Sequence, residues 1–241
     1  MTEFVRGVGI GSWLGTSGDV VLLTRDLFDA IEFDAACTGD HRAAAEQMIS
    51  LAATGTQTDE FPRSEAYLRA GEQWLLADDP AAAAQGFRRA LADGRRTFID
   101  PRVPLARALF MLDEAAEAEA LIQQIEQEQP SDPRIYDLVA ELLVERSDLN
   151  GALRWVTTGV GLCLGRLGDG WDAGRPALAP GSALEQAGGP PRNSAGGDPT
   201  ELRLLLTLRY RIRNDLGLPE DDYDKLLDDL PSGPAAPAGD S

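Results

Sequence analysis

The chain has 241 residues, and 43% of them are hydrophobic, which is enough to bury a core in one or two domains. Its formal net charge is −18, with 40 acidic and 22 basic residues, and this balance argues against nucleic acid or an anionic membrane as a partner. No apolar run approaches the ~18 residues of a membrane span. The only two cysteines, Cys37 and Cys163, are far apart, which suits a reducing compartment, so we expect a cytoplasmic protein.

Residues 1–25 are expected to form a flexible N-terminal tail. The run GVGIGSWLG at residues 7–15 superficially resembles a phosphate-binding loop. It lacks the Gly-Lys-Ser/Thr ending of a nucleotide loop, and Ser12 stands where the dinucleotide pattern needs its third glycine. With Glu3 near the start and glycines interrupting the apolar run, the segment is also a poor signal peptide.

Helical periodicity begins near Asp26, and residues 26–60 predict a degenerate pair of antiparallel helices. Asp40 is a suitable N-cap for the second helix of this pair. His41 lies four residues after Cys37, but the Thr38-Gly39 turn between them disfavours a nucleophilic Cys-His pair. We expect no catalytic residues in the chain.

Three stretches within residues 61–164 share one register of small and large residues. The first contains Tyr67, Ala70, Gly71, Trp74, Ala83, Phe87 and Ala90. The second contains Arg102, Leu105, Ala106, Leu109, Ala118, Ile122 and Ile125, and is closed by Pro130. The third contains Tyr136, Val139, Ala140, Leu143, Ala152, Val156 and Gly159. Equivalent alanines are 35 and 34 residues apart, which favours a helical repeat over a generic alanine-rich bundle.

This register predicts two antiparallel helices in each unit, with small residues where the helices cross and large residues between them. The expected small residues are Gly71, Ala106 and Ala140 on the first helices and Ala83, Ala118 and Ala152 on the second. The expected large pairs are Trp74 with Phe87, Leu109 with Ile122, and Leu143 with Val156. Asp79-Pro80 and Asp148 are suitable starts for second helices. Pro101 and Pro104 place the start of the middle first helix near Val103.

The chain changes character after the third unit. Residues 165–198 are rich in Gly, Pro and Ala and predict a flexible loop. Residues 199–230 predict capping helices, with Asp198 as the N-cap and Gly217 as the C-cap of the longer one. The apolar residues of that helix lie on one face: Leu205, Leu208, Ile212 and Leu216. Residues 231–241 are expected to be a disordered tail.

The capping helix also carries Arg203, Arg209 and Arg213, largely opposite its apolar face. We expect a solvated face, paired with the acidic stretch at residues 220–224. The alternative is a face that binds an acidic group. Acidic doublets elsewhere lack the alternating oxygen ligands of a calcium loop, so no metal site is expected.

The repeated register resembles the tetratricopeptide repeat family. More narrowly, DPRV at residues 100–103, DLNGALRW at residues 148–155 and RIRNDLGLPEDDYDKLL at residues 211–227 resemble a repeat group of high-GC Gram-positive bacteria. Some members of that group carry a zinc motif called SEC-C. Two cysteines and the single His41 cannot supply its four ligands, so no metal or cofactor is expected.

The resemblance implies an all-α, right-handed solenoid of three to four helix pairs, which is a scaffold and not an enzyme. Its first helices would line a concave groove that binds a peptide or protein segment. The groove residues expected from this register are Leu68, Glu72, Leu75, Val103, Arg107, Phe110, Met111, Asp137, Glu141, Val144 and Glu145.

The composition of this expected groove indicates the class of its ligand. Leu68 and Glu72 replace the basic and amide residues that clamp chaperone tails in this family, so a segment with basic and apolar residues is favoured. The alternative function is a self-associating assembly domain whose groove holds its own chain. A homo-oligomer is therefore compatible with the sequence.

Overall fold

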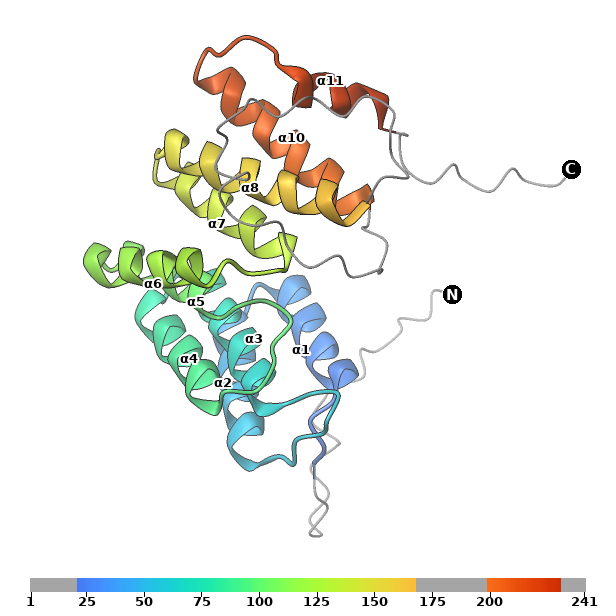
Figure 1. The fold of residues 1–241 in the computed structure, drawn as a ribbon. Coiled ribbons are helices and arrows are strands. Elements are labelled where there is room, and N and C mark those ends of the chain that lie inside the picture. Colours follow the sequence, from blue (N-terminus) through green and yellow to red (C-terminus); the bar gives the residue numbers. More distant parts are fainter. Residues whose placement is uncertain (1–20, 168–198, 231–241) are drawn as a thin grey trace, which may run out of the picture. The chain divides into compact units, whose positions relative to one another are not determined.

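The computed structural model describes residues 21–167 and 199–230, and within these ranges the chain is all-α (Figure 1). Its one strand-like feature there is an isolated β-bridge between Leu22 and Thr56. The chain divides into two compact units, Met1–Thr97 and Phe98–Ser241. The tails expected at residues 1–20 and 231–241, and most of the expected loop, lie outside the described residues.

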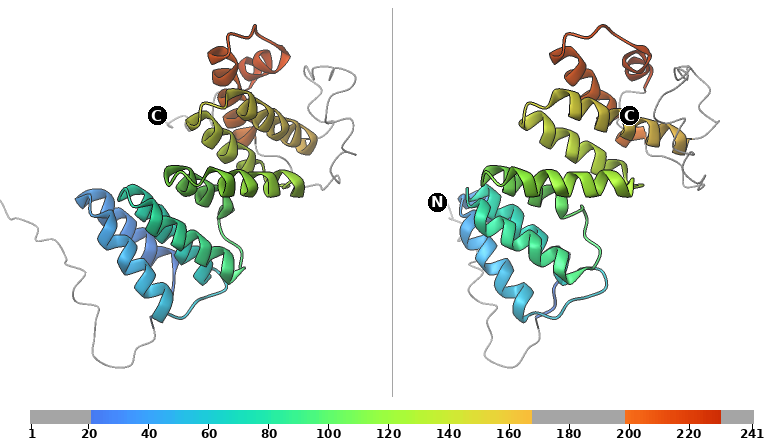
Figure 2. Two further views of the ribbon diagram at one scale, coloured as in Figure 1. Left: turned by 90° about the vertical axis from the view of Figure 1, so that its left-hand side faces the viewer. Right: turned by 60° about the vertical axis from the view of Figure 1, so that its left-hand side comes forward.

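The first unit consists of two helix pairs, in which each helix packs against the next (Figure 2). The helices are α1 (Arg25–Thr38), α2 (His41–Thr54), α3 (Arg63–Leu76) and α4 (Pro80–Asp93). The side chains of Thr24, Asp40 and Asp79 cap α1, α2 and α4 by accepting from backbone N–H groups. Phe28 and Phe61 meet in the core of this unit, with ring centroids 4.7 Å apart.

The crossing of α3 and α4 depends on small residues, as the register predicts. Ala83 is fully buried, and a Cβ built on Gly71 would lie 2.4 Å from Cε1 of Phe87. Gly86, which the register leaves out, faces the backbone of Gly71 and allows the two helices to approach closely. Trp74 is not the core partner of Phe87 that we expected. It is half-buried, and the guanidinium of Arg42 stacks on its ring at 4.9 Å.

The second unit contains two further helix pairs and the C-terminal helices. The elements are α5 (Arg102–Met111), α6 (Ala115–Glu128), α7 (Pro133–Glu145), α8 (Leu149–Leu167), α10 (Pro199–Asp215) and α11 (Asp222–Asp229). α5 packs against α6 and α7 against α8, while α10 lies against both α7 and α8 (Figure 1). The repeat alanines Ala106, Ala118, Ala140 and Ala152 are all fully buried.

The ends of these helices follow local signals in the sequence. Asp132 caps α7 ahead of Pro133, and the carboxylate of Asp148 accepts from the Gly151 N–H at 2.9 Å. α5 starts at Arg102, one residue earlier than expected, because Asp100 accepts the Arg102 N–H. α8 continues to Leu167, so it includes the first residues of the segment expected to be a loop.

The outer helix α10 packs through the apolar face that its spacing predicts. Leu205, Leu208 and Ile212 are buried, and Leu216 is half-buried. Gly159 of α8 permits this contact, because a Cβ there would lie 2.8 Å from Cβ of Tyr136 and 3.1 Å from Leu205. The expected solvated arginine face is wrong for Arg209, which is only 4% exposed. Its pairing with the acidic stretch is present and is described below.

Candidate binding surfaces

The surface expected on α3, the first helix of the first clear repeat, is only partly exposed. Leu68 is 1% exposed and packs inside the helices, so its placement on an exposed turn is wrong. Glu72 and Leu75 are half-buried. The neighbouring Leu76 is 61% exposed, and Phe33 on α1 is 72% exposed. These two exposed apolar side chains were not among the expected groove residues.

A charged cluster joins α1 to α3 in this unit. Arg69 Nη1 lies 2.6 Å from Asp29 Oδ1 and 3.5 Å from Glu32 Oε2, and its Nε lies 3.5 Å from Glu65 Oε1. Its guanidinium also lies 5.4 Å from the ring centroid of Phe61. The single guanidinium of Arg69 therefore pairs with three carboxylates. Glu65 at the i−4 position was the one local sign of this cluster in the sequence.

Glu72 is one turn beyond Arg69 on α3, and it is the least compensated carboxylate of this surface. Among the described residues it has neither a hydrogen bond nor an ion pair. Burial, followed by repulsion from Glu32 and Glu65, raises its pKa to about 7, although the charge of Arg69 opposes this. Burial also raises the pKa of Glu32. A cation placed between these side chains would restore ionisation of Glu72.

The surface on α5 in the second unit mixes apolar and paired basic side chains. Val103 is buried, so its expected exposure is also wrong. Arg107 is half-buried and its Nη2 lies 3.0 Å from Glu145 Oε1 of α7. Phe110 is half-buried beneath Arg146, whose guanidinium lies 4.7 Å from the ring centroid. Met111 is 48% exposed.

The surface on α7 repeats the pattern of an uncompensated carboxylate. Asp137 is half-buried, and burial together with repulsion from Glu141 raises its pKa to about 6. Glu141 is exposed and stands one turn along the same helix, and Val144 is half-buried beyond it. Asp137 has neither a hydrogen bond nor an ion pair within the described ranges. α7 therefore presents a carboxylate pair with an apolar neighbour.

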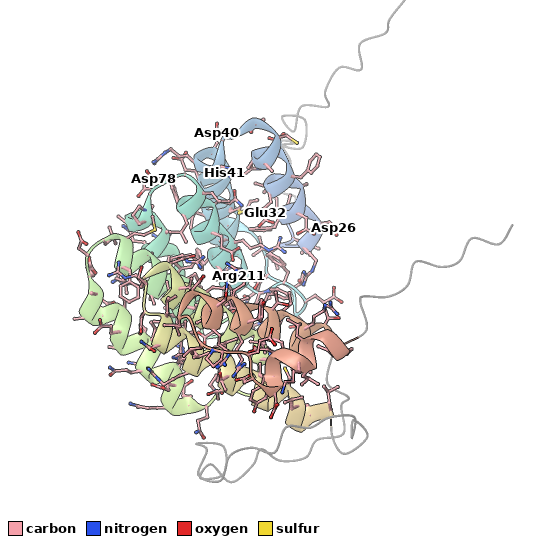
Figure 3. The ribbon with its side chains drawn as sticks, turned by 90° about the horizontal axis from the view of Figure 1, so that it is seen from above. Asp26, Glu32, Asp40, His41, Asp78 and Arg211 are labelled. Carbon is pink, nitrogen blue, oxygen red and sulfur yellow. The ribbon has the colours of Figure 1, made fainter. Side chains whose placement is uncertain are left out.

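The single histidine has a structural partner. His41 begins α2, next to Asp40 (Figure 3), and its Nδ1 lies 2.9 Å from Gln73 Oε1 of α3. Cys37 is exposed near the end of α1. The hydrogen bond of His41 thus ties α2 to α3.

Within residues 21–167 and 199–230, no group of three or more His, Cys, Asp or Glu side chains is placed to hold a metal ion. In those same ranges, no helix combines the length and the apolar character needed to cross a bilayer.

Comparison with known proteins gives one match. The family model described as tetratricopeptide repeat matches residues 75–142, which run from the end of α3 to α7. No curated protein and no solved structure matches the chain. Proteins with these repeats generally act as protein–protein interaction modules. Residues 75–142 are thus similar to the tetratricopeptide repeat family, and the consecutive packed helix pairs are consistent with an all-α helical repeat.

Proposed function

We propose that the chain is a non-enzymatic scaffold that binds a peptide or protein segment on the first helices of its repeats. The family match supports this role. The observation that carries the proposal is the state of two carboxylates, Glu72 on α3 and Asp137 on α7. Each is half-buried without an ion pair among the described residues, and each has a raised pKa. Such groups carry a free-energy cost that a bound cation would remove.

The chemistry of both surfaces favours a segment with basic and apolar side chains. Glu72 stands next to the exposed Leu76 on α3, and Asp137 and Glu141 precede Val144 on α7. In the second unit, Phe110 and Met111 add apolar area on α5. Lysine or arginine side chains would pair with the carboxylates while neighbouring residues cover the apolar groups.

Self-association is the second candidate. Another copy, or another segment of the same chain, would then occupy the same first-helix surfaces. The exposed Phe33 and Leu76 favour it, because large apolar side chains on a surface are often covered in an assembly. The two candidates differ in whether the surfaces are free in the purified protein.

A charge-reversal experiment tests the scaffold proposal. The variant Glu72→Arg/Glu141→Arg reverses one charge on α3, in the first compact unit, and one on α7, in the second. The control Glu46→Arg/Glu126→Arg makes the same charge change at exposed positions of the second helices α2 and α6. Proteins captured from a native lysate by the wild type and the control, but lost from the first variant, support the proposal. Equal capture by all three contradicts it, and a concentration-dependent oligomer with no captured partner favours self-association.

A further inference from the structure

The two C-terminal helices are joined by a buried ionic cluster. Arg209 Nη2 lies 2.5 Å from Asp221 Oδ2, and its Nη1 lies 3.2 Å from Asp224 Oδ1. Arg213 Nη1 lies 3.1 Å from the same Asp221 oxygen, and its Nε lies 3.1 Å from Asp224 Oδ2. Arg209 and Arg213 of α10 therefore each contact both carboxylates at the start of α11. Asp224 and Arg209 are only 7% and 4% exposed, whereas the side chain of Asp221 is 32% exposed, so the cluster is shielded from solvent at all but one edge.

The arginines are oriented by groups outside α11 as well. Arg209 Nε donates to Oγ1 of Thr157 on α8 at 3.2 Å, which directs the rest of the guanidinium toward Asp221 and Asp224. Arg209 also lies 4.6 Å from the ring centroid of Tyr223. Thr157 of α8 and Arg209 of α10 thus form one polar site, and the carboxylates at the start of α11 bind in it.

The helix that fills the site depends on these contacts for its own structure. α11 has only eight residues, which is too short for a helix to be stable alone in water. Its capping box uses the same two carboxylates, Asp221 and Asp224. Leu226 and Leu230 are buried and supply its apolar contacts. Release of α11 from α10 should therefore unfold it.

The connection between the helices permits such a release. Gly217, with a left-handed φ of 66°, follows the end of α10 and reverses the helical conformation, and residues 217–220 are exposed. Arg213 donates to the carbonyl of Pro219, and Arg203 donates to that of Leu230 at 3.2 Å. Glu220, Asp222 and Lys225 are further charged neighbours whose side chains the structure describes; all three are exposed, and Lys225 pairs with Asp222. α11 can leave without displacing another helix.

We propose that Arg209 and Arg213, with Thr157, form a binding site for an acidic amphipathic helix, and that α11 is its exchangeable occupant. The ligand class is a helix with two carboxylates three residues apart in its first turn, followed by leucines on the same face. A buried ionic cluster gives such docking its specificity, because an apolar helix would leave both arginines unpaired. The site lies on α8 and α10 and is separate from the surfaces assigned to the proposed function.

The first arm of the test removes the carboxylates that hold α11 in the full chain. The variant Asp221→Asn/Asp224→Asn is compared with the control Glu220→Gln/Asp222→Asn. The control changes the net charge by the same amount, but at two exposed neighbouring positions. Amide hydrogen exchange is measured across residues 221–230. We expect exchange at least tenfold faster in the first variant and close to wild type in the second. Unchanged protection in the first variant would overturn the proposal.

The second arm supplies the helix in trans. A peptide with the sequence of residues 218–230 is titrated into the first variant, and fluorescence anisotropy reports binding. Saturable binding is expected, at least tenfold weaker to the wild type because α11 occupies its site, and absent for a peptide with asparagine at both positions. No binding to the variant, or equal binding to variant and wild type, would overturn the proposal. If circular dichroism shows that the double variant is unfolded, the single variant Asp224→Asn replaces it in both arms.

Discussion

The backbones of Gly71 and Gly86 face each other where α3 crosses α4: a Cβ on Gly86 would lie 3.1 Å from the Gly71 Cα. At this distance there is no room for a side chain on either helix unless the helices separate. The second side of Gly71 is filled by the buried ring of Phe87. The position of the whole pair thus depends on one contact between glycines.

The first prediction is that Gly71→Ala destabilises the chain. The new methyl group would lie 2.4 to 2.8 Å from three atoms of the Phe87 ring, which is buried and has little room to shift. We expect a loss of about 1–3 kcal/mol in the free energy of unfolding, despite the roughly 1 kcal/mol that alanine gains in helix propensity. Urea denaturation followed by circular dichroism measures it.

Gly165→Ala is the matched control for this change. Gly165 is also helical, on α8, but a Cβ there meets nothing within 4 Å. The same substitution should be neutral or stabilising by up to about 1 kcal/mol. A similar loss of stability in both variants would show that the Gly71 contact is not the cause.

The second prediction concerns the crossing alanine of the same helix pair. Ala83 is fully buried on α4, so Ala83→Phe forces α3 and α4 apart. We expect a loss of at least about 1–3 kcal/mol and a lower thermal midpoint. Ala81→Phe is the control, because Ala81 is exposed two residues earlier on the same helix. An unchanged midpoint for Ala83→Phe would mean that the repeat register is incorrect.

The repeat architecture could be predicted from sequence because it depends on residues whose roles are local and periodic. The small residues Ala83, Ala118 and Ala152 recur at nearly constant spacing, and Asp79 and Asp148 mark helix starts. Gly86 was missed because it lies outside the family register. Trp74 was misplaced because an aromatic ring can be covered by a cation, here Arg42, as well as by the core.

The binding surfaces were less predictable, since side-chain exposure depends on contacts between helices far apart in the sequence. Leu68 and Val103 were expected on exposed turns of α3 and α5 but are buried in the fold. The arginines of α10 were expected to be solvated because amphipathic spacing assigns only one apolar face. Spacing carries no information about a second helix, such as α11, that folds back onto the polar face.

The third prediction concerns Arg69, the single cation among three carboxylates of the first unit. Its side chain is only 12% exposed. Arg69→Met keeps most of its apolar bulk but removes the ion pairs of the guanidinium with Asp29, Glu32 and Glu65, so we expect a loss of about 1–3 kcal/mol. The loss should shrink as the pH falls and the carboxylates protonate. Lys225→Met removes an exposed, solvent-screened ion pair and should leave the stability close to that of the wild type. Equal effects of the two substitutions would contradict a structural role for the Arg69 cluster.

The last prediction follows from the pKa of Glu72, which is raised to about 7 from an ordinary value of 4.5. Between these two values the folded chain binds a proton more tightly than the unfolded chain does. Below about pH 4.5, Glu72 is protonated in both states and the stability does not depend on its titration. Between pH 4.5 and 7 its contribution to stability falls as the pH rises, and above about pH 7 it is constant. Glu72→Gln removes this loss, so the variant should match the wild type near pH 4.

At pH 8 the same variant should be more stable than the wild type by about 1–2 kcal/mol, a range reduced from the full shift because the side chain is only half-buried. The measurement is the difference between the two urea denaturation profiles at each pH, in which the titration of the many other carboxylates cancels. Glu126→Gln, at an exposed position of α6, serves as the control and should show no such pH dependence. Parallel profiles for Glu72→Gln and the wild type would mean that Glu72 titrates normally in the folded chain, and the electrostatic support for a cationic ligand on α3 would be lost.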